Sequence, residues 1–130
     1  MKARQREYET VYLLRADLSD GEISDARQRL EDAIEEAGGH VLKTDDWGVR
    51  DLAYEVKDES SGRTFERGQY QYIRYMVPSS AATVAEEQLK FVEPTLKYLT
   101  VKVDDDLIPE ERLEEPVEKG EGASLPYESE

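Results

Sequence analysis

Adjacent carboxylates are the strongest hint of reactivity in this chain. Asp45 is followed directly by Asp46, and Glu35 by Glu36. Two neighbouring carboxyl groups can serve as general acid and general base when one of them keeps its proton near neutral pH. With 31 Asp and Glu residues in 130, however, such pairs also arise wherever a solvated surface is densely charged. We favour the surface interpretation and expect no catalytic residues and no enzyme activity.

Other reactive or metal-binding groups are scarce. The chain has no cysteine, which excludes disulfides and cysteine-based zinc sites. Its single histidine, His40, cannot form a histidine cluster. Asp104-Asp105-Asp106 could hold a cation loosely but lacks the loop spacing of a dedicated calcium site, and no glycine-rich phosphate-binding loop is present. We expect no metal, no cofactor and no small-molecule substrate.

Charge is distributed unevenly along the chain. The net charge is −14, yet residues 104–130 carry 11 acidic and 2 basic side chains, whereas residues 1–6 carry three basic side chains and no acidic one. At physiological ionic strength the Debye length is about 8 Å, so charges on a tail held away from a basic patch are heavily screened. The acidic total therefore weakens an RNA-binding interpretation without excluding it.

The sequence shows no sign of membrane insertion or export. No apolar run approaches the roughly 20 residues that a membrane helix needs. The basic N-terminus is not followed by the apolar stretch of a signal peptide. We therefore expect no membrane partner and a cytoplasmic location.

Hydrophobic periodicity predicts four strands and two helices. Residues 19–22 form a capping box, a Ser with a Glu three positions later, and the Gly38-Gly39 pair is a helix stop. Between them apolar residues recur with a helical period. The expected strands are 7–15, 41–56 with a bend at Gly48, 69–77 after a polar loop at 58–68, and 96–103; Ser79 or Ser80 is expected to cap a short second helix that ends near Pro94.

The order β-α-β-β-α-β predicts an α+β, ferredoxin-like fold, with both helices on one face of a four-stranded antiparallel sheet. Residues 1–103 are expected to form this domain. From residue 104 apolar side chains become sparse, and glutamate and proline dominate. Such a segment buries too little apolar area to offset its ordering entropy, so we expect residues 104–130 to form a flexible acidic tail.

Large side chains on both faces of the sheet indicate a contact surface. Tyr70 and Tyr72 share one side of the third strand, while the first strand carries apolar groups on both of its sides. An apolar surface that the helices leave uncovered marks a binding site, although tyrosines also pack across strands without any partner. The aromatic signature of the RNA-recognition motif is absent, so a protein is the preferred partner for this surface.

Four passages together resemble the family of bacterial small-subunit ribosomal protein six. They are Arg6–Tyr12, Glu35–Gly39, Trp47–Tyr54 (Trp-Gly-Val-Arg-Asp-Leu-Ala-Tyr) and Leu96–Val101. Each is weak alone, but they occur in the family's order and spacing across about residues 4–103. The family has the ferredoxin-like fold that the periodicity predicts independently.

The resemblance implies a structural role in the ribosome. Members bind the central domain of 16S ribosomal RNA as a heterodimer with small-subunit ribosomal protein eighteen, during assembly of the platform. The match implies RNA contacts at Arg4, Arg6, Tyr8, Lys90, Lys97 and Lys102. The arginines and lysines among them would pair with phosphates. The expected contacts with the protein partner are Trp47, Arg50, Leu52 and Tyr54, with Tyr70 and Tyr72 on the uncovered face.

Some positions depart from the family pattern. Arg50 is followed by Asp51 where the family usually has a second basic residue, and Glu86-Glu87 stand where it often has arginines. Both departures lower the local positive charge, so more of the RNA affinity would come through the partner protein. The alternative interpretation is a non-ribosomal, acidic protein–protein interaction module of ferredoxin-like fold.

Overall fold

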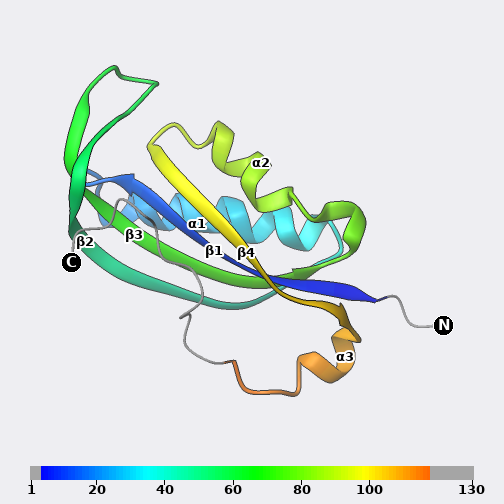
Figure 1. Cartoon of the computed structure of the whole chain (residues 1–130). Helices are drawn as coiled ribbons and strands as arrows, with labels where there is room; N and C mark the ends of the chain where they lie inside the picture. Colours follow the sequence, from blue (N-terminus) through cyan, green and yellow to red (C-terminus); the bar gives the residue numbers. More distant parts are fainter. Residues whose placement is uncertain (1–3, 118–130) are drawn as a thin grey trace.

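The computed structural model describes residues 4–117. Its elements are β1 (Gln5–Arg15), α1 (Asp20–Glu36), β2 (His40–Lys57), β3 (Thr64–Val77), the short 3₁₀ helix η1 (Ser79–Ala81), α2 (Val84–Phe91), β4 (Thr95–Leu107) and α3 (Pro109–Arg112). The strands form one antiparallel sheet in the order β2-β3-β1-β4. Both α1 and α2 lie on the same face of that sheet (Figure 1). The predicted ferredoxin-like architecture is confirmed.

Local sequence signals set the ends of α1. The Ser19 hydroxyl accepts a hydrogen bond from the Glu22 backbone N–H, and the Glu22 carboxylate accepts one from the Ser19 N–H, so the predicted capping box is confirmed. At the other end Gly38 has a φ of +87°, a conformation that favours glycine. The next residue approaches β3 closely, since a Cβ on Gly39 would lie 2.5 Å from the Met76 carbonyl oxygen. The chain can therefore turn directly from α1 into β2.

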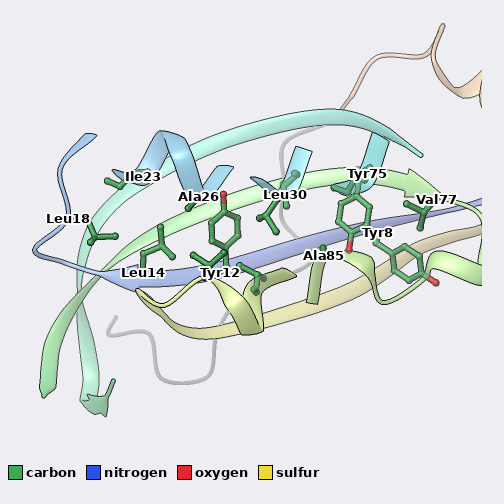
Figure 2. Packing of buried hydrophobic residues seen from close by; sticks show 14 residues of the cluster. Tyr8, Tyr12, Leu14, Leu18, Ile23, Ala26, Leu30, Tyr75, Val77 and Ala85 are labelled. Atoms are coloured by element: carbon green, nitrogen blue, oxygen red, sulfur yellow. The ribbon is translucent and has the colours of Figure 1, made fainter. Parts of the chain in front are cut away.

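The main core lies between the helices and the sheet (Figure 2). From α1 the apolar stripe contributes Ile23, Ala26, Leu30 and Ile34, all buried. The sheet contributes the even-numbered side of β1 and the facing side of β3, including Tyr12, Leu14, Ile73, Tyr75 and Val77. Burying such side chains contributes roughly 1.5–3 kcal/mol each.

A second cluster lies on the opposite face of the sheet, which we call the open face. It contains Val11, Leu13, Leu52, Val56, Phe65, Tyr70, Tyr72 and Leu96, with Trp47, Leu99 and Val101 packed against it. The predicted apolar character of both sheet faces is therefore confirmed.

Several predicted boundaries differ from the structure. β3 begins at Thr64, which shortens the polar loop to residues 58–63. This loop folds around Asp58, whose carboxylate accepts hydrogen bonds from Ser60 and Ser61. The residues expected to cap the second helix instead form η1, and α2 starts only at Val84.

The largest difference concerns the C-terminal segment. β4 continues to Leu107, which pairs with Gln5 of β1, and α3 follows directly. Residues 104–112 thus belong to the folded body, although they fall in the segment expected to be a flexible tail. The prediction was based on the small number of apolar residues. β4 continues into this segment because its backbone groups form hydrogen bonds with β1, which needs no apolar side chains. The remainder of the expected tail, 118–130, lies outside the described residues.

Candidate functional site

The carboxylate pairs considered for acid–base chemistry are exposed and serve local structure. The Asp46 carboxylate accepts a hydrogen bond from the backbone N–H of Gly48 at 2.8 Å, where the register of β2 shifts. The Glu35-Glu36 pair lies exposed in the last turn of α1. Within residues 4–117 there is no group of three or more His, Cys, Asp or Glu that could hold a metal ion. No helix in that range has the length and apolarity to cross a membrane.

Four of the expected RNA contacts meet where β1 begins and β4 ends. Arg4 immediately precedes β1, and Arg6 and Tyr8 follow on that strand. In the register of the sheet Tyr8 lies opposite Lys102 of β4. Alternation along β1 places Arg6, Tyr8 and Lys102 on the side of the helices.

Carboxylates at the end of β4 neutralise part of this positive charge. Arg4 Nε lies 3.6 Å from Asp106 Oδ1, and Lys102 Nζ lies 3.3 Å from Asp105 Oδ2. We expected the acidic segment to be held away from the basic residues, and for residues 104–106 this is wrong, because strand pairing fixes them beside the start of β1. Arg6, in contrast, forms no ion pair within residues 4–117.

Tyr8 is placed in the core and not on an accessible surface. Its side chain is only 8% exposed and stacks on Tyr75, with ring centroids 5.9 Å apart. A nucleotide base could not stack on Tyr8 without repacking the helix side of the sheet. Burial therefore leaves the Tyr8 ring closed to stacking with a base, and the expected RNA contact of Tyr8 stays a prediction.

Lys97 and Lys90 lie apart from this cluster. Lys97 is opposite Leu13 in the register, so it projects from the open face, and it is exposed. Lys90 is exposed in the last turn of α2, which ends where β4 begins, at the opposite end of β4 from Lys102. Neither lysine forms an ion pair within the part of the chain that the structure describes. The six candidates therefore do not form one continuous patch.

Four of the six expected protein-partner residues, Trp47, Arg50, Tyr70 and Tyr72, form one aromatic stack on the open face. The Trp47 ring lies 5.2 Å from the Tyr72 ring at an interplanar angle of 18°. The Arg50 guanidinium lies 5.6 Å from the Trp47 ring and 5.4 Å from the Tyr70 ring. Such cation–π and stacking contacts fix the outer side chains in place. Tyr70 and Tyr72 form the floor of this arrangement.

Burial divides the same residues into outer and inner members. Tyr70 is 0% and Tyr72 1% exposed, and Leu52 is buried with Val56 and Phe65, whereas Tyr54 is 57% exposed. Large neighbouring side chains cover Tyr70, Tyr72 and Leu52, so direct contact with a partner would need these neighbours to move, and the expected contact stays a prediction. Arg50 and Tyr54 are exposed at the surface, and Trp47 is half-buried.

A row of buried polar groups occupies the other end of the open face. The Glu7 carboxylate accepts hydrogen bonds from Nε of Arg74 and from two nitrogens of Arg112, Nε at 2.5 Å and Nη2 at 3.2 Å. Beside it the Tyr72 hydroxyl donates to the Glu9 carboxylate at 2.8 Å. Glu7, Glu9 and Tyr72 are each at most 3% exposed. These charges are retained in the core because each has a partner of opposite charge or a hydrogen bond.

The titration of these groups reflects the pairing. Burial raises the pKa of Glu7, but the hydrogen bonds from Arg112 and Arg74 outweigh burial and hold its pKa below the ordinary value. The bond to Glu7 raises the pKa of Arg112 despite burial. Burial, reinforced by the bond to Glu9, raises the pKa of Tyr72. Glu7, Arg74 and Arg112 are therefore charged at neutral pH, whereas Tyr72 is neutral.

Sequence reasoning missed this row. The repeats Glu7-x-Glu9 and Tyr72-x-Arg74 carry a partial signal, since residues two apart share a strand face. Which of these residues face each other across the two strands depends on the register of β1 against β3. That register pairs Glu9 with Arg74 and Glu7 with Met76. Nothing in the sequence around Arg112 indicates its contact with a residue 105 positions earlier.

Comparison with known proteins finds relatives along most of the chain. The family described as "Ribosomal protein S6" matches residues 7–102. The "Small ribosomal subunit protein bS6" of Trichlorobacter lovleyi is 31% identical over 121 residues, covering 93% of each chain. That of Christiangramia forsetii is 34% identical over 97 residues, covering 75% of this chain and 81% of the relative.

A solved structure agrees with this similarity. The crystal structure of 30S ribosomal protein S6 from Thermotoga maritima matches with a TM-score of 0.65, covering 75% of this chain and 87% of that chain. The two sequences are 22% identical, so this likeness supports the fold alone. The family match and the curated relatives carry the assignment to a family.

Proposed function

The chain belongs to the ribosomal protein S6 family, and from this premise we propose that it binds the central domain of 16S ribosomal RNA together with small-subunit ribosomal protein eighteen during platform assembly. As a small-subunit protein of this family it works on the cytoplasmic ribosome. The family match over residues 7–102, which spans the sheet except the first two residues of β1 and the end of β4, carries the proposal. Holding RNA in this way requires no catalytic group.

Accessible cations support the RNA part of the proposal. Arg6, Lys90 and Lys97 form no ion pair within residues 4–117, so each can pair with a phosphate without first losing a carboxylate. Arg4 and Lys102 must exchange Asp106 and Asp105 for phosphate, which weakens their contribution. Contacts of this kind fix the position of the RNA and do not read its sequence.

The aromatic stack supports the protein part of the proposal. Trp47 and Arg50 are held in fixed positions over Tyr72 and Tyr70. Tyr54 lies further along the same strand, β2, and its ring is exposed. Tryptophan, tyrosine and arginine are the residues that most often dominate protein–protein binding energy. The stack is prearranged in the free chain, which lowers the entropy lost on binding.

A salt titration tests the RNA interface. The protein, mixed with protein eighteen, is titrated against a central-domain RNA fragment at several salt concentrations. Affinity should fall as salt rises, since phosphate contacts release counterions. Arg6→Ala and Lys97→Ala should each weaken binding and reduce the slope of log affinity against log salt by about 1. Arg67→Ala, which removes an exposed cation paired with Asp51 on the β2–β3 hairpin, is the matched control.

The acidic interaction module remains the second candidate, because carboxylates pair with Arg4 and Lys102. It predicts that the chain binds its protein partner while none of the cation variants changes the RNA affinity of the pair. A salt slope that is the same for Arg6→Ala, Lys97→Ala and the unaltered protein would favour this module over the RNA-binding role.

A further inference from the structure

The segment after β4 lies across one end of the open face. We call residues 108–117 the C-terminal strap. Figure 1 shows α3, the helical part of the strap, on the side of the sheet opposite α2. Only Pro109 and Arg112 of α3 are buried, and Leu113 beside them is 51% exposed. The strap is thus attached to the sheet mainly through one arginine side chain.

The place that Arg112 occupies is built for a guanidinium group. Glu7, 2% exposed, offers one carboxylate oxygen to Arg112 Nε and the other to Nη2. This side-on, two-bond geometry matches the planar fork of arginine, which the point charge of a lysine ammonium cannot reproduce. Arg74 bonds the same carboxylate from β3 and keeps it oriented. The sheet thus holds the receptor carboxylate in position independently of the strap.

A recess surrounds this carboxylate. It has a volume of about 200 Å³ and is lined by Glu7, Arg74, Val103 and Leu107 of the sheet and by Arg112 and Pro116 of the strap. Asp104 and Glu115 also lie on its wall. Without Arg112, one sheet cation, Arg74, would face the carboxylates of Glu7 and Asp104, with Glu9 next along the strand. The vacated recess would therefore be negatively charged and would attract a cation.

We propose that this recess is a docking site for an arginine side chain of a basic partner protein, and that Arg112 fills the site until the partner displaces it. The net charge of −14 favours a partner rich in basic residues. Displacement breaks the hydrogen bonds of Arg112 and exposes Pro109, the other buried residue of α3, while the rest of α3 is already exposed. Docking of an arginine in this recess would require neither RNA nor the ribosome.

Arg112 and an external arginine side chain compete for the same recess. The affinity for an external arginine falls in proportion to the fraction of molecules in which the recess is open. If Arg112 leaves the recess in ~10% of molecules, its removal strengthens external binding ~10-fold. Removal of a distant cation changes only the net charge and should have a much smaller effect.

Titration of full-length variants with two peptides tests this competition. Acetylated, amidated hexa-arginine and hexa-lysine peptides are titrated by calorimetry at physiological salt. Arg112→Ala should bind hexa-arginine ~10-fold more tightly than the unaltered protein, with a clearly smaller gain for hexa-lysine. Arg67→Ala, which removes an exposed cation on the hairpin, is the matched control and should show little gain with either peptide. Adding Glu7→Gln to Arg112→Ala should abolish the gain.

A second readout reports on the site in the unaltered protein. The Nε–H resonance of Arg112 should move toward that of free arginine as hexa-arginine is added, while hexa-lysine leaves it in place. Should Arg112→Ala lose its fold, Arg112→Lys is titrated instead, since it keeps the charge but loses the fork geometry. An unchanged hexa-arginine affinity, equal gains with both peptides, or an Arg112 resonance that stays fixed at saturation would each overturn the proposal.

Discussion

Arg112 of α3 donates two hydrogen bonds to Glu7 of β1, a residue 105 positions earlier in the chain, at 2.5 and 3.2 Å. Both side chains are at least nine-tenths buried. This contact joins the segment after the last strand to the first strand and so includes residues 108–112 in the folded body. It also places a shared carboxylate between two arginines, because Arg74 bonds Glu7 from β3.

The stability of the fold should depend strongly on Glu7. Glu7→Gln leaves Arg74 and Arg112 buried without a negative partner, and breaking a buried ion pair from one side typically costs about 3–5 kcal/mol. Urea unfolding should show a loss of about that size. Glu55→Gln, an exposed position on β2, is the matched control and should stay within about 0.5 kcal/mol. A Glu7→Gln variant as stable as the control would mean that the ion pairs of Glu7 make no net contribution to the free energy of unfolding.

The Glu7 carboxylate should make the free energy of unfolding depend on pH. The pKa of Glu7 is lowered from its ordinary value of 4.5, so the unfolded chain binds the proton more readily than the folded one. The stabilisation is therefore complete above 4.5 and is lost as the pH falls through the folded pKa. The difference in unfolding free energy between the unaltered protein and Glu7→Gln should be constant well above pH 4.5 and should shrink as the pH falls below that value. A constant difference would contradict the lowered pKa.

Freeing the paired cations should strengthen RNA binding. Asp105→Asn releases Lys102 and Asp106→Asn releases Arg4 from pairs at 3.3 and 3.6 Å. Exposed pairs are worth up to about 1 kcal/mol, so each substitution should raise the affinity for the central-domain fragment by up to about fivefold. Asp51→Asn removes the same charge beside Arg67 on the hairpin and serves as the control. Equal gains from all three would indicate only a general charge effect.

The aromatic stack should dominate binding of the protein partner. Trp47→Ala removes the ring that lies between Tyr72 and Arg50 and should weaken binding of protein eighteen by about tenfold or more, as truncation of a central interface residue does. Phe91→Ala removes an aromatic ring of 68% exposure on α2 and should leave the affinity unchanged. Calorimetric titration of the two proteins without RNA measures both. Equal losses in the two variants would place the partner elsewhere.

Local sequence signals sufficed to predict the order of the main elements and the architecture. The Ser19–Glu22 capping box and the glycines after α1 predicted the helix correctly, because caps and positive φ angles depend on adjacent residues. The order of strands and helices then left few topologies for a chain of this length. The family passages, including Trp47–Tyr54, were equally visible without coordinates.

Tertiary structure alone decided which of these residues are accessible and what they pair with. Tyr8, Tyr70 and Tyr72 looked like contact residues, but alternation along a strand does not reveal which face the helices cover or what stacks on the other. The pairing of Asp105 and Asp106 with Lys102 and Arg4 depends on strand pairing that continues beyond the apolar pattern. The contact between Glu7 and Arg112 depends on the path of the chain after β4, and a separation of 105 residues leaves no periodic trace in the sequence.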